Sequence, residues 1–238
     1  MAQPPDHCFN RRGFLVGAAA APLAGLAGNA EAQPAVQPAA AAGPAPAPAS
    51  TEDGARVWFK NNEADMVTAL VDRLIPASPS GPGGVESGVV TFIDRQLAGA
   101  YGAGATWYMR GPFAEGTPSQ GWQLPLTPAR LYRLSLEALG RVVEAEHGKS
   151  VSELSPEECD TLLTRMEKQP FDLGGLPSTV FFEQLLANPN EGYFADPLYG
   201  GNRGAAAWKQ IEYPGANPVR TDLVTDKTPF NGDPVSIG

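Results

Sequence analysis

The sequence predicts a mainly α-helical protein, with one small domain of about four to six helices joined by long ordered loops. Two observations support this class. Apolar residues recur three and four positions apart in several segments, which is the spacing of one helix face. No segment shows the alternation of apolar and polar residues that is typical of a half-buried strand. The helical domain is expected to span residues 56–215.

Residues 1–32 are expected to form an export signal, because paired arginines precede a run rich in Ala, Gly and Leu over residues 16–28. This order is typical of a twin-arginine signal peptide. The expected recognition residues are Arg11, Arg12, Phe14 and Leu15, and the expected cleavage residues are Ala30 and Ala32. An ordinary secretory signal, a short apolar helix and an uncleaved anchor remain alternatives, although a membrane span needs about 20 apolar residues.

Residues 33–55 are expected to form a linker, since residues 39–49 are Ala, Pro and Gly alone. Repeated prolines favour extended, polyproline-like backbone, and the segment has no apolar face to bury. We expect a spacer between the signal and the domain; order on a partner surface is the alternative.

Two helices are predicted in the first part of the domain. An apolar stripe over residues 66–75 is followed by Pro76, and a second stripe covers residues 89–97 after a Gly- and Pro-rich loop. The aromatic-containing stretch at residues 101–126 has no helical spacing and is expected to be a long exposed loop.

The next two helices have clear start signals. Thr127 followed by Pro128 is a capping residue before a proline in the first turn, and the stripe continues to His147. Ser155 and Glu158 have the spacing of a capping box. A fifth helix is expected to begin near Phe181 and to be stopped by the sequence Asn188-Pro189-Asn190.

The inventory of reactive residues predicts no cofactor and no metal in this chain. Cleavage at residue 32 would leave Cys159 as the one cysteine and His147 as the one histidine. Zinc sites and cysteine-held clusters need several such ligands, and no haem-attachment, dinucleotide, P-loop or nucleophile-elbow motif occurs. His147 is expected to favour a helix C-terminus. Cys159 is expected to be a buried thiol, with an intersubunit disulfide as the alternative.

The formal net charge is −9, and the two acidic and two basic residues of the expected signal cancel. An acidic chain without clusters of Lys and Arg is unsuited to nucleic acid and to anionic membrane surfaces. The polar tail at residues 216–238 is expected to be disordered alone and to order on a partner.

The most unusual segment is Phe181–Gly215, in which aromatic residues, glycines and prolines alternate with a few polar groups. Its order EGYFADPxYGGN, then WK, then YPG, resembles the gluconate 2-dehydrogenase subunit 3 family of small subunits. The sequence departs from the pattern at Gly204 and Ala205, where Asp and a large apolar residue are expected. It also departs at Glu212, where Gly is expected.

The resemblance implies a non-catalytic small (gamma) subunit that binds a large FAD-dependent dehydrogenase of a sugar, sugar acid or polyol. It also implies that a cytochrome c subunit with haem can take up the electrons. Because twin-arginine export carries folded proteins, we expect this chain to bind its flavoprotein in the cytoplasm, assist its maturation and carry it through the twin-arginine translocon to the periplasm. A free-standing exported helical binding protein, whose aromatic loop holds a small ligand, is the alternative.

Two interpretations of the segment remain open at the level of sequence. It can be a self-packed loop, a rigid face for the partner formed by Tyr199, Asn202, Arg203 and Trp208, or both at once. Glu191 and Asp196 are expected to cap backbone amides. The candidate interface or motif residues are Glu191, Tyr193, Phe194, Asp196, Tyr199, Asn202, Arg203, Trp208 and Tyr213.

Overall fold

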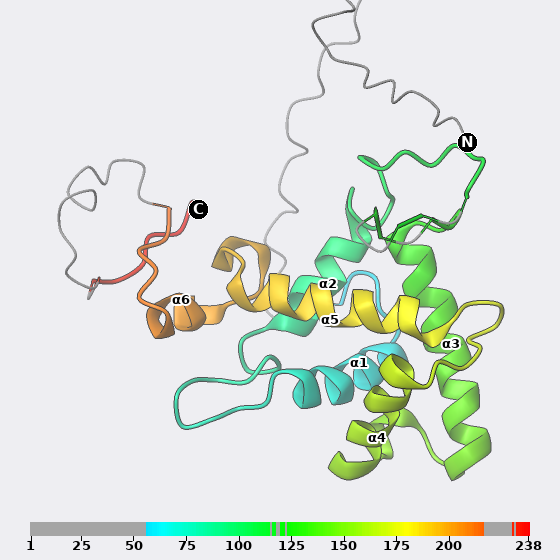
Figure 1. Ribbon diagram of the computed structural model, residues 1–238. Coiled ribbons are helices and arrows are strands. Elements are labelled where there is room, and N and C mark those ends of the chain that lie inside the picture. Colours follow the sequence, from blue (N-terminus) through cyan, green and yellow to red (C-terminus); the bar gives the residue numbers. More distant parts are fainter. Residues whose placement is uncertain (1–55, 115, 118–119, 122, 217–229, 231) are drawn as a thin grey trace, which may run out of the picture. The chain divides into compact units, whose positions relative to one another are not determined.

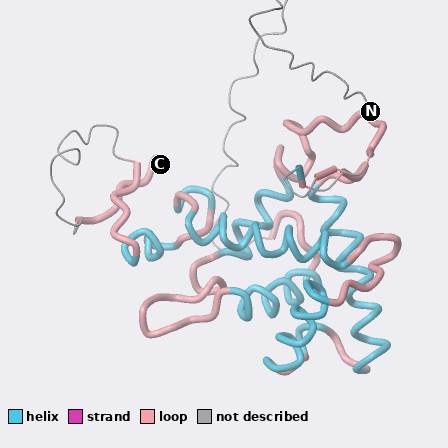
Figure 2. The backbone as a smooth tube through the Cα atoms, in the orientation of Figure 1, coloured by secondary structure: helices cyan, strands magenta, loops and turns pink. Residues whose placement is uncertain are grey.

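The computed structural model describes residues 56–114, 116–117, 120–121, 123–216, 230 and 232–238. These residues contain six α-helices and no named strand (Figures 1 and 2). The helices are α1 (Asn61–Leu74), α2 (Val89–Ala98), α3 (Pro128–His147), α4 (Pro156–Lys168), α5 (Ser178–Phe194) and α6 (Ala206–Gln210). Short 3-10 helices lie at Val151–Glu153, Pro197–Tyr199 and Arg203–Ala205. The predicted mainly α class is confirmed; the expected signal and linker lie outside the described residues.

Helix α5 organises the core, because it contacts each of the other five α-helices. Its Phe181 is fully buried and meets the ring of Tyr132 on α3 edge to face, with ring centres 5.3 Å apart. The largest fully buried side chains come from five helices and one loop: Leu70, Ile93, Tyr132, Leu139, Met166, Leu173 and Phe181. Burying such apolar surface is the main stabilising contribution to a helical domain.

The predicted helix starts are confirmed for α3 and α4. The amide of Arg130 donates to Thr127 Oγ1 at 3.3 Å, and Gly148 ends α3 with a left-handed φ of 67°. Ser155 accepts from the amide of Glu158, whose carboxylate accepts in return from the amide of Ser155 at 2.7 Å. The described part of the stretch at residues 101–126 is mainly loop and turn, as expected.

The predicted end of the fifth helix is wrong, because α5 continues through Pro189 to Phe194. A proline in a helix interior has no N–H to donate and costs about 3 kcal/mol. Side-chain contacts offset this cost. Asn188 Oδ1 accepts from Tyr132 Oη at 2.9 Å and from Gln184 Nε2 at 2.9 Å, and both Asn188 and Pro189 are buried. A turn at this point would remove these groups from the core.

One buried carboxylate fixes the chain where the domain begins. Asp94 on α2 is 3% exposed and accepts three backbone hydrogen bonds from the amides of Val57 (2.6 Å), Trp58 (2.9 Å) and Phe59 (2.7 Å). Carboxylates that accept several amides are strong acceptors, and their loss leaves buried donors unsatisfied. Asp94 therefore joins the segment before α1 to α2.

Asp94→Asn is expected to lower the free energy of unfolding by about 2 to 4 kcal/mol, because the new amide group faces backbone donors. Urea unfolding followed by circular dichroism measures the change. Asp72→Asn is the matched control, since Asp72 is exposed on α1; equal stabilities of the two variants would contradict the role of Asp94.

Candidate partner-binding site

The C-terminal end of helix α5, the two 3-10 helices that follow it and α6 form a single packed unit, which we call the motif unit (residues 192–215). Trp208 on α6 is 6% exposed, and its Nε1 donates to the carbonyl of Phe194 at 2.8 Å. The ring of Tyr213 meets Trp208 edge to face at 5.2 Å. The indole thus fastens α6 to the end of α5, as a buried Trp with a satisfied N–H commonly does.

Asn202 holds the turn between these elements. It is fully buried and left-handed, with φ of 46°. Its Nδ2 donates to the carbonyl of Ala195 at 2.9 Å, and its Oδ1 accepts from the amide of Ala207 at 2.9 Å. Asn tolerates this backbone conformation better than most residues, and here it also satisfies two backbone groups.

Two glycines permit the backbone to approach itself. A Cβ at Gly201 would lie 2.1 Å from the carbonyl oxygen of Gly192, and a Cβ at Gly192 would lie 2.6 Å from the ring of Phe92. Neither position has room for a side chain, so the order of glycines in the segment follows from close backbone packing.

The two acidic residues of the motif have different roles. Asp196 caps the 3-10 helix that begins at Pro197, accepting from the amide of Leu198 at 3.0 Å, as predicted. Glu191 does not cap backbone: it lies inside α5 and accepts from Asn188 Nδ2 at 2.9 Å. The prediction for Glu191 is wrong because it assumed that the helix had already ended.

Asp196 also binds the end of the chain. It accepts from Ser236 Oγ at 2.6 Å and from the amide of Ile237 at 2.9 Å. Partial burial raises the pKa of Asp196, but the hydrogen bonds from Ser236, Leu198 and Ile237 outweigh it and lower the pKa below its ordinary value. The contact is therefore fully stabilising above the unfolded-state pKa of about 3.9 and is lost as the pH falls through the lower folded-state pKa.

The departures from the family pattern coincide with unusual backbone. Glu212 stands where the pattern has Gly, and its φ is 56°; Ala205 has φ of 54°. Left-handed backbone favours glycine, so a Gly at position 212 fits this conformation better than the Glu of this chain.

The structure divides the four residues that were predicted for a partner face, and partner binding through them stays a prediction. Asn202 and Trp208 are buried, so the self-packed interpretation holds for both, while Arg203 is exposed and Tyr199 is half-buried. Tyr193 is also buried, and its hydroxyl donates to the carbonyl of Pro82 at 2.9 Å. Residue composition misled the interpretation because Trp and Tyr are common both in cores and at interfaces.

Exposed apolar side chains do occur on the motif unit and on the C-terminal residues that pack against it. Besides Ile211 (55% exposed), five such side chains come from segments that contact one another, and we call these five the apolar cluster: Phe194 (44% exposed), Leu198 (42%), Tyr213 (45%), Val235 (48%) and Ile237 (60%). Gathered exposed apolar groups are typical of protein-binding surfaces. Phe194 and Tyr213 were among the predicted interface or motif residues; Leu198, Val235 and Ile237 were not.

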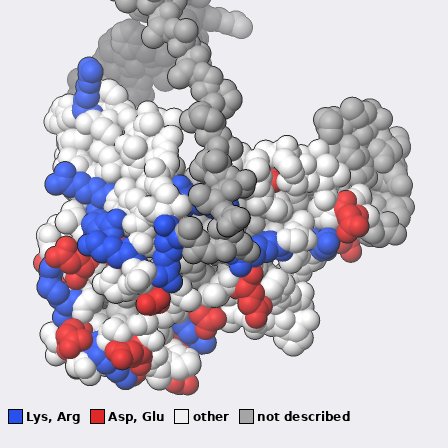
Figure 3. Space-filling model, turned by 180° about the vertical axis from the view of Figure 1, so that it is seen from behind, with Lys and Arg blue, Asp and Glu red and all other residues white. Residues whose placement is uncertain are grey.

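Charge elsewhere on the surface is mixed. In the lower half of Figure 3, Lys and Arg side chains lie next to Asp and Glu on the described surface. Arg73 and Asp160, at 2.8 Å, are one such pair of opposite charges. Such exposed pairs add little to stability and do not create a field of one sign.

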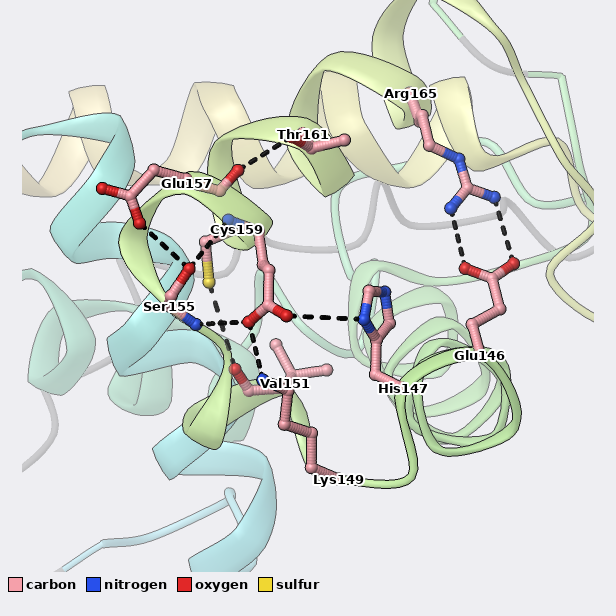
Figure 4. A network of polar contacts seen from close by, with 10 residues as sticks. Glu146, His147, Lys149, Val151, Ser155, Glu157, Cys159, Thr161 and Arg165 are labelled. Atoms are coloured by element: carbon pink, nitrogen blue, oxygen red, sulfur yellow. Dashed lines mark hydrogen bonds and ion pairs between the residues drawn. The ribbon is translucent and has the colours of Figure 1, made fainter.

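Cys159 and His147 lie in a polar network around the start of α4 (Figure 4). Cys159 is 2% exposed, its Sγ lies 4.0 Å from the carbonyl of Val151, and burial raises the pKa of its thiol. His147 ends α3, and its Nδ1 lies 3.7 Å from the carboxylate of Glu158, which also accepts from Lys149 Nζ at 2.7 Å. An intersubunit disulfide would require Cys159 to become accessible.

A cavity of about 470 Å³ lies between the loop around Trp107 and the middle of α5. It is lined by Trp107, Tyr108, Phe113, Glu183 and Gln184, among others, and by no residue of the motif unit. In the described ranges, no three His, Cys, Asp or Glu side chains gather as a metal site requires. None of the helices described here has the length and apolar character to cross a bilayer.

Comparison with known protein families identifies the family to which this chain belongs. The profile of the gluconate 2-dehydrogenase subunit 3 family matches residues 61–215, which is more than half of the chain and runs from the start of α1 to the end of the motif unit. The chain therefore belongs to the gluconate 2-dehydrogenase subunit 3 family. Comparison with curated proteins and with solved structures found no match.

Gly201→Ala is expected to destabilise the domain by about 2 kcal/mol or more, because the new methyl group would collide with the Gly192 carbonyl and neither backbone segment can move freely. The midpoint of thermal unfolding measures this. Gly99→Ala is the control, since a Cβ there makes only ordinary contacts at 3.4 Å; a similar loss in both variants would argue against the close approach.

Proposed function

We propose that this chain is the non-catalytic small subunit of a flavin-dependent sugar or sugar-acid dehydrogenase, and that it binds the large FAD-containing subunit through the apolar cluster. The family describes a subunit of gluconate 2-dehydrogenase, which implies a dehydrogenase partner. The observation that carries the proposal is that the motif unit has hydrogen-bonded polar groups inside and exposed apolar side chains outside. Its polar groups are satisfied internally by Asn202 and Asp196, while Phe194, Leu198 and Tyr213 remain exposed.

This division suits a binding surface physically. A rigid frame loses little conformational freedom on association, so more of the gain from burying apolar surface is retained as affinity. Aromatic side chains at the centre of such a surface usually contribute most of the binding energy. The FAD belongs, in this proposal, to the large subunit, and a cytochrome c subunit with haem would receive the electrons.

The proposal includes export. Arg11 and Arg12 precede Phe14 and Leu15 in the order typical of a twin-arginine signal, and that route carries folded proteins. A small subunit that binds its flavoprotein in the cytoplasm can supply the signal for both chains. The complex would then function in the periplasm and be associated with the membrane only through its other subunits.

Phe194→Lys combined with Tyr213→Lys is expected to reduce recovery of the co-expressed dehydrogenase subunit by at least about tenfold, since two charges would be buried at the centre of the interface. Affinity purification through a tag on this chain, followed by quantitative gel analysis, measures the ratio. Leu134→Lys, on α3, is a matched control because Leu134 is 40% exposed and lies outside the cluster.

Unchanged recovery with the double variant, in a protein that still folds by circular dichroism, would rule out this surface. If no dehydrogenase subunit is recovered even with the unaltered chain, and it behaves as a stable monomer, the free-standing binding protein becomes the better explanation.

Arg11→Lys with Arg12→Lys is expected to leave the dehydrogenase subunit in the cytoplasm, because the translocon would no longer recognise the signal carried by the small subunit. Dehydrogenase activity in periplasmic and cytoplasmic fractions gives the result. The control is Arg110→Lys, at an exposed position of the domain. Normal periplasmic activity in the double variant would end the export proposal while leaving the binding proposal intact.

A further inference from the structure

The C-terminal residues that the structure describes return to the motif unit. Most of the tail that was expected to be disordered alone, residues 217–229 and 231, lies outside the described residues. Val235 donates from its amide to the carbonyl of Pro214 at 3.0 Å and accepts from the amide of Ala216 at 2.7 Å. It forms a parallel bridge with Gly215. Figure 1 shows the red C-terminal residues running beside the segment that follows α6.

Two further groups hold this segment, which we call the C-terminal strap (residues 232–238). The Asp196 carboxylate accepts from Ser236 and Ile237, as described above, and Lys209 Nζ lies 3.3 Å from Asp233. Chain ends are usually frayed unless they are tied down by hydrogen bonds or burial. Here the contacts are polar and backbone contacts, so order is obtained without burying the apolar side chains.

Gly215 is the position on which this arrangement depends. Its φ is 76°, and a Cβ there would lie 2.2 Å from the carbonyl oxygen of Val235 and 2.7 Å from its amide nitrogen. The strap thus lies directly against the backbone of Gly215, at a distance that no other residue permits. At the other end, Gly238 lies against Leu198 of the apolar cluster.

The strap is held in place by hydrogen bonds, yet its two apolar side chains stay exposed, Val235 at 48% and Ile237 at 60%. This combination is unusual for the end of a chain. Both lie next to cluster residues, because Val235 is bonded to the residues after Tyr213 and Ile237 shares the Asp196 carboxylate with Leu198. Ordering exposed apolar side chains gives a free chain no hydrophobic gain, whereas it prepares a surface for association.

We propose that the C-terminal strap forms part of the surface that binds the dehydrogenase subunit, with Val235 and Ile237 packing against an apolar region of that subunit. This inference rests on the proposed function, but it concerns residues beyond positions 61–215 that the family profile matches. The strap lies next to two of the exposed residues of the motif unit, because Gly238 lies against Leu198 and Val235 is bonded to Pro214, which follows Tyr213. An apolar partner surface fits the strap because Val235 and Ile237 are 48% and 60% exposed.

The test uses the assembled complex of full-length chains. Exchange of a labelled small subunit out of the complex gives the dissociation rate of each variant. Ile237→Lys is expected to accelerate dissociation by about tenfold or more, as burial of an introduced charge does at interfaces. Gly215→Ala is expected to have a similar effect, because its methyl group would displace the strap.

Gly204→Ala is the matched control for Gly215→Ala. Gly204 also lies in the motif unit with a left-handed φ of 65°, but nothing lies within 4 Å of a Cβ there. It therefore introduces the same backbone strain without the collision and is expected to change the dissociation rate by less than about threefold. If Gly215→Ala fails to fold, Ile237→Lys decides alone, because its exposed side chain contributes little to the core.

The outcomes separate this inference from the proposed function. If the Phe194 and Tyr213 variant weakens the complex while Ile237→Lys dissociates at the unaltered rate, the strap is not part of the interface, and this inference is wrong. If neither weakens it, the apolar cluster as a whole is wrong. If Ile237→Lys instead abolishes self-association, seen by light scattering of the small subunit, the occupant is a second copy of this chain and the inference is overturned.

Discussion

The motif unit depends on one close approach, in which the backbone at Gly201 lies directly on the carbonyl of Gly192 at the end of α5. This contact turns the chain back onto the helix that it has just left. It brings Asn202 to within hydrogen-bonding distance of the Ala195 carbonyl and Trp208 to within reach of the Phe194 carbonyl. The carbonyls at the C-terminus of α5, which have no partners inside the helix, are thereby satisfied by side chains from a later segment. A side chain at either glycine would separate these groups.

The approach is possible because α5 is longer than its sequence suggests. Had the helix ended at Asn188, Gly192 would not lie on the helical surface that contacts α2. The buried Asn188 joins Tyr132, Gln184 and Glu191 by hydrogen bonds, and this network replaces the backbone bond that Pro189 cannot make. Burial also raises the pKa of Tyr101, whose hydroxyl accepts from Asn188 Nδ2, to about 12, so this phenol stays protonated at neutral pH. The hydrogen bonds of Asn188 in the core therefore let α5 continue to Phe194, and the end of the helix sets where the motif unit begins.

Local signals in the sequence predicted the parts of the fold that local interactions determine. The caps at Thr127 and Ser155 are contacts within a few residues, and both helices begin where these residues indicate. The end of α5 depends on Tyr132, 56 positions away from Asn188, and the anchor at Asp94 acts on residues more than 30 positions earlier. Neither contact has a local signature. The same holds for the candidate site. Its unusual composition identified the segment from the sequence, but only the fold distinguishes the buried Trp208 from the exposed Phe194 and Tyr213.

That distinction separates positions of the motif unit that can vary from positions that cannot. The residues that shape the motif unit, Gly192, Gly201 and Asn202, face inward and tolerate little change, because each is in contact with backbone or ring atoms. The apolar cluster is exposed, so most of its side chains can change without loss of the frame beneath them; Tyr213 is the exception, because its ring packs edge to face on Trp208. A partner surface can therefore be matched by substitutions at exposed positions while the turn stays the same. The glutamate at position 212, exposed and left-handed, shows that some departures are accommodated even in the frame, as strain in the backbone and not as loss of the fold.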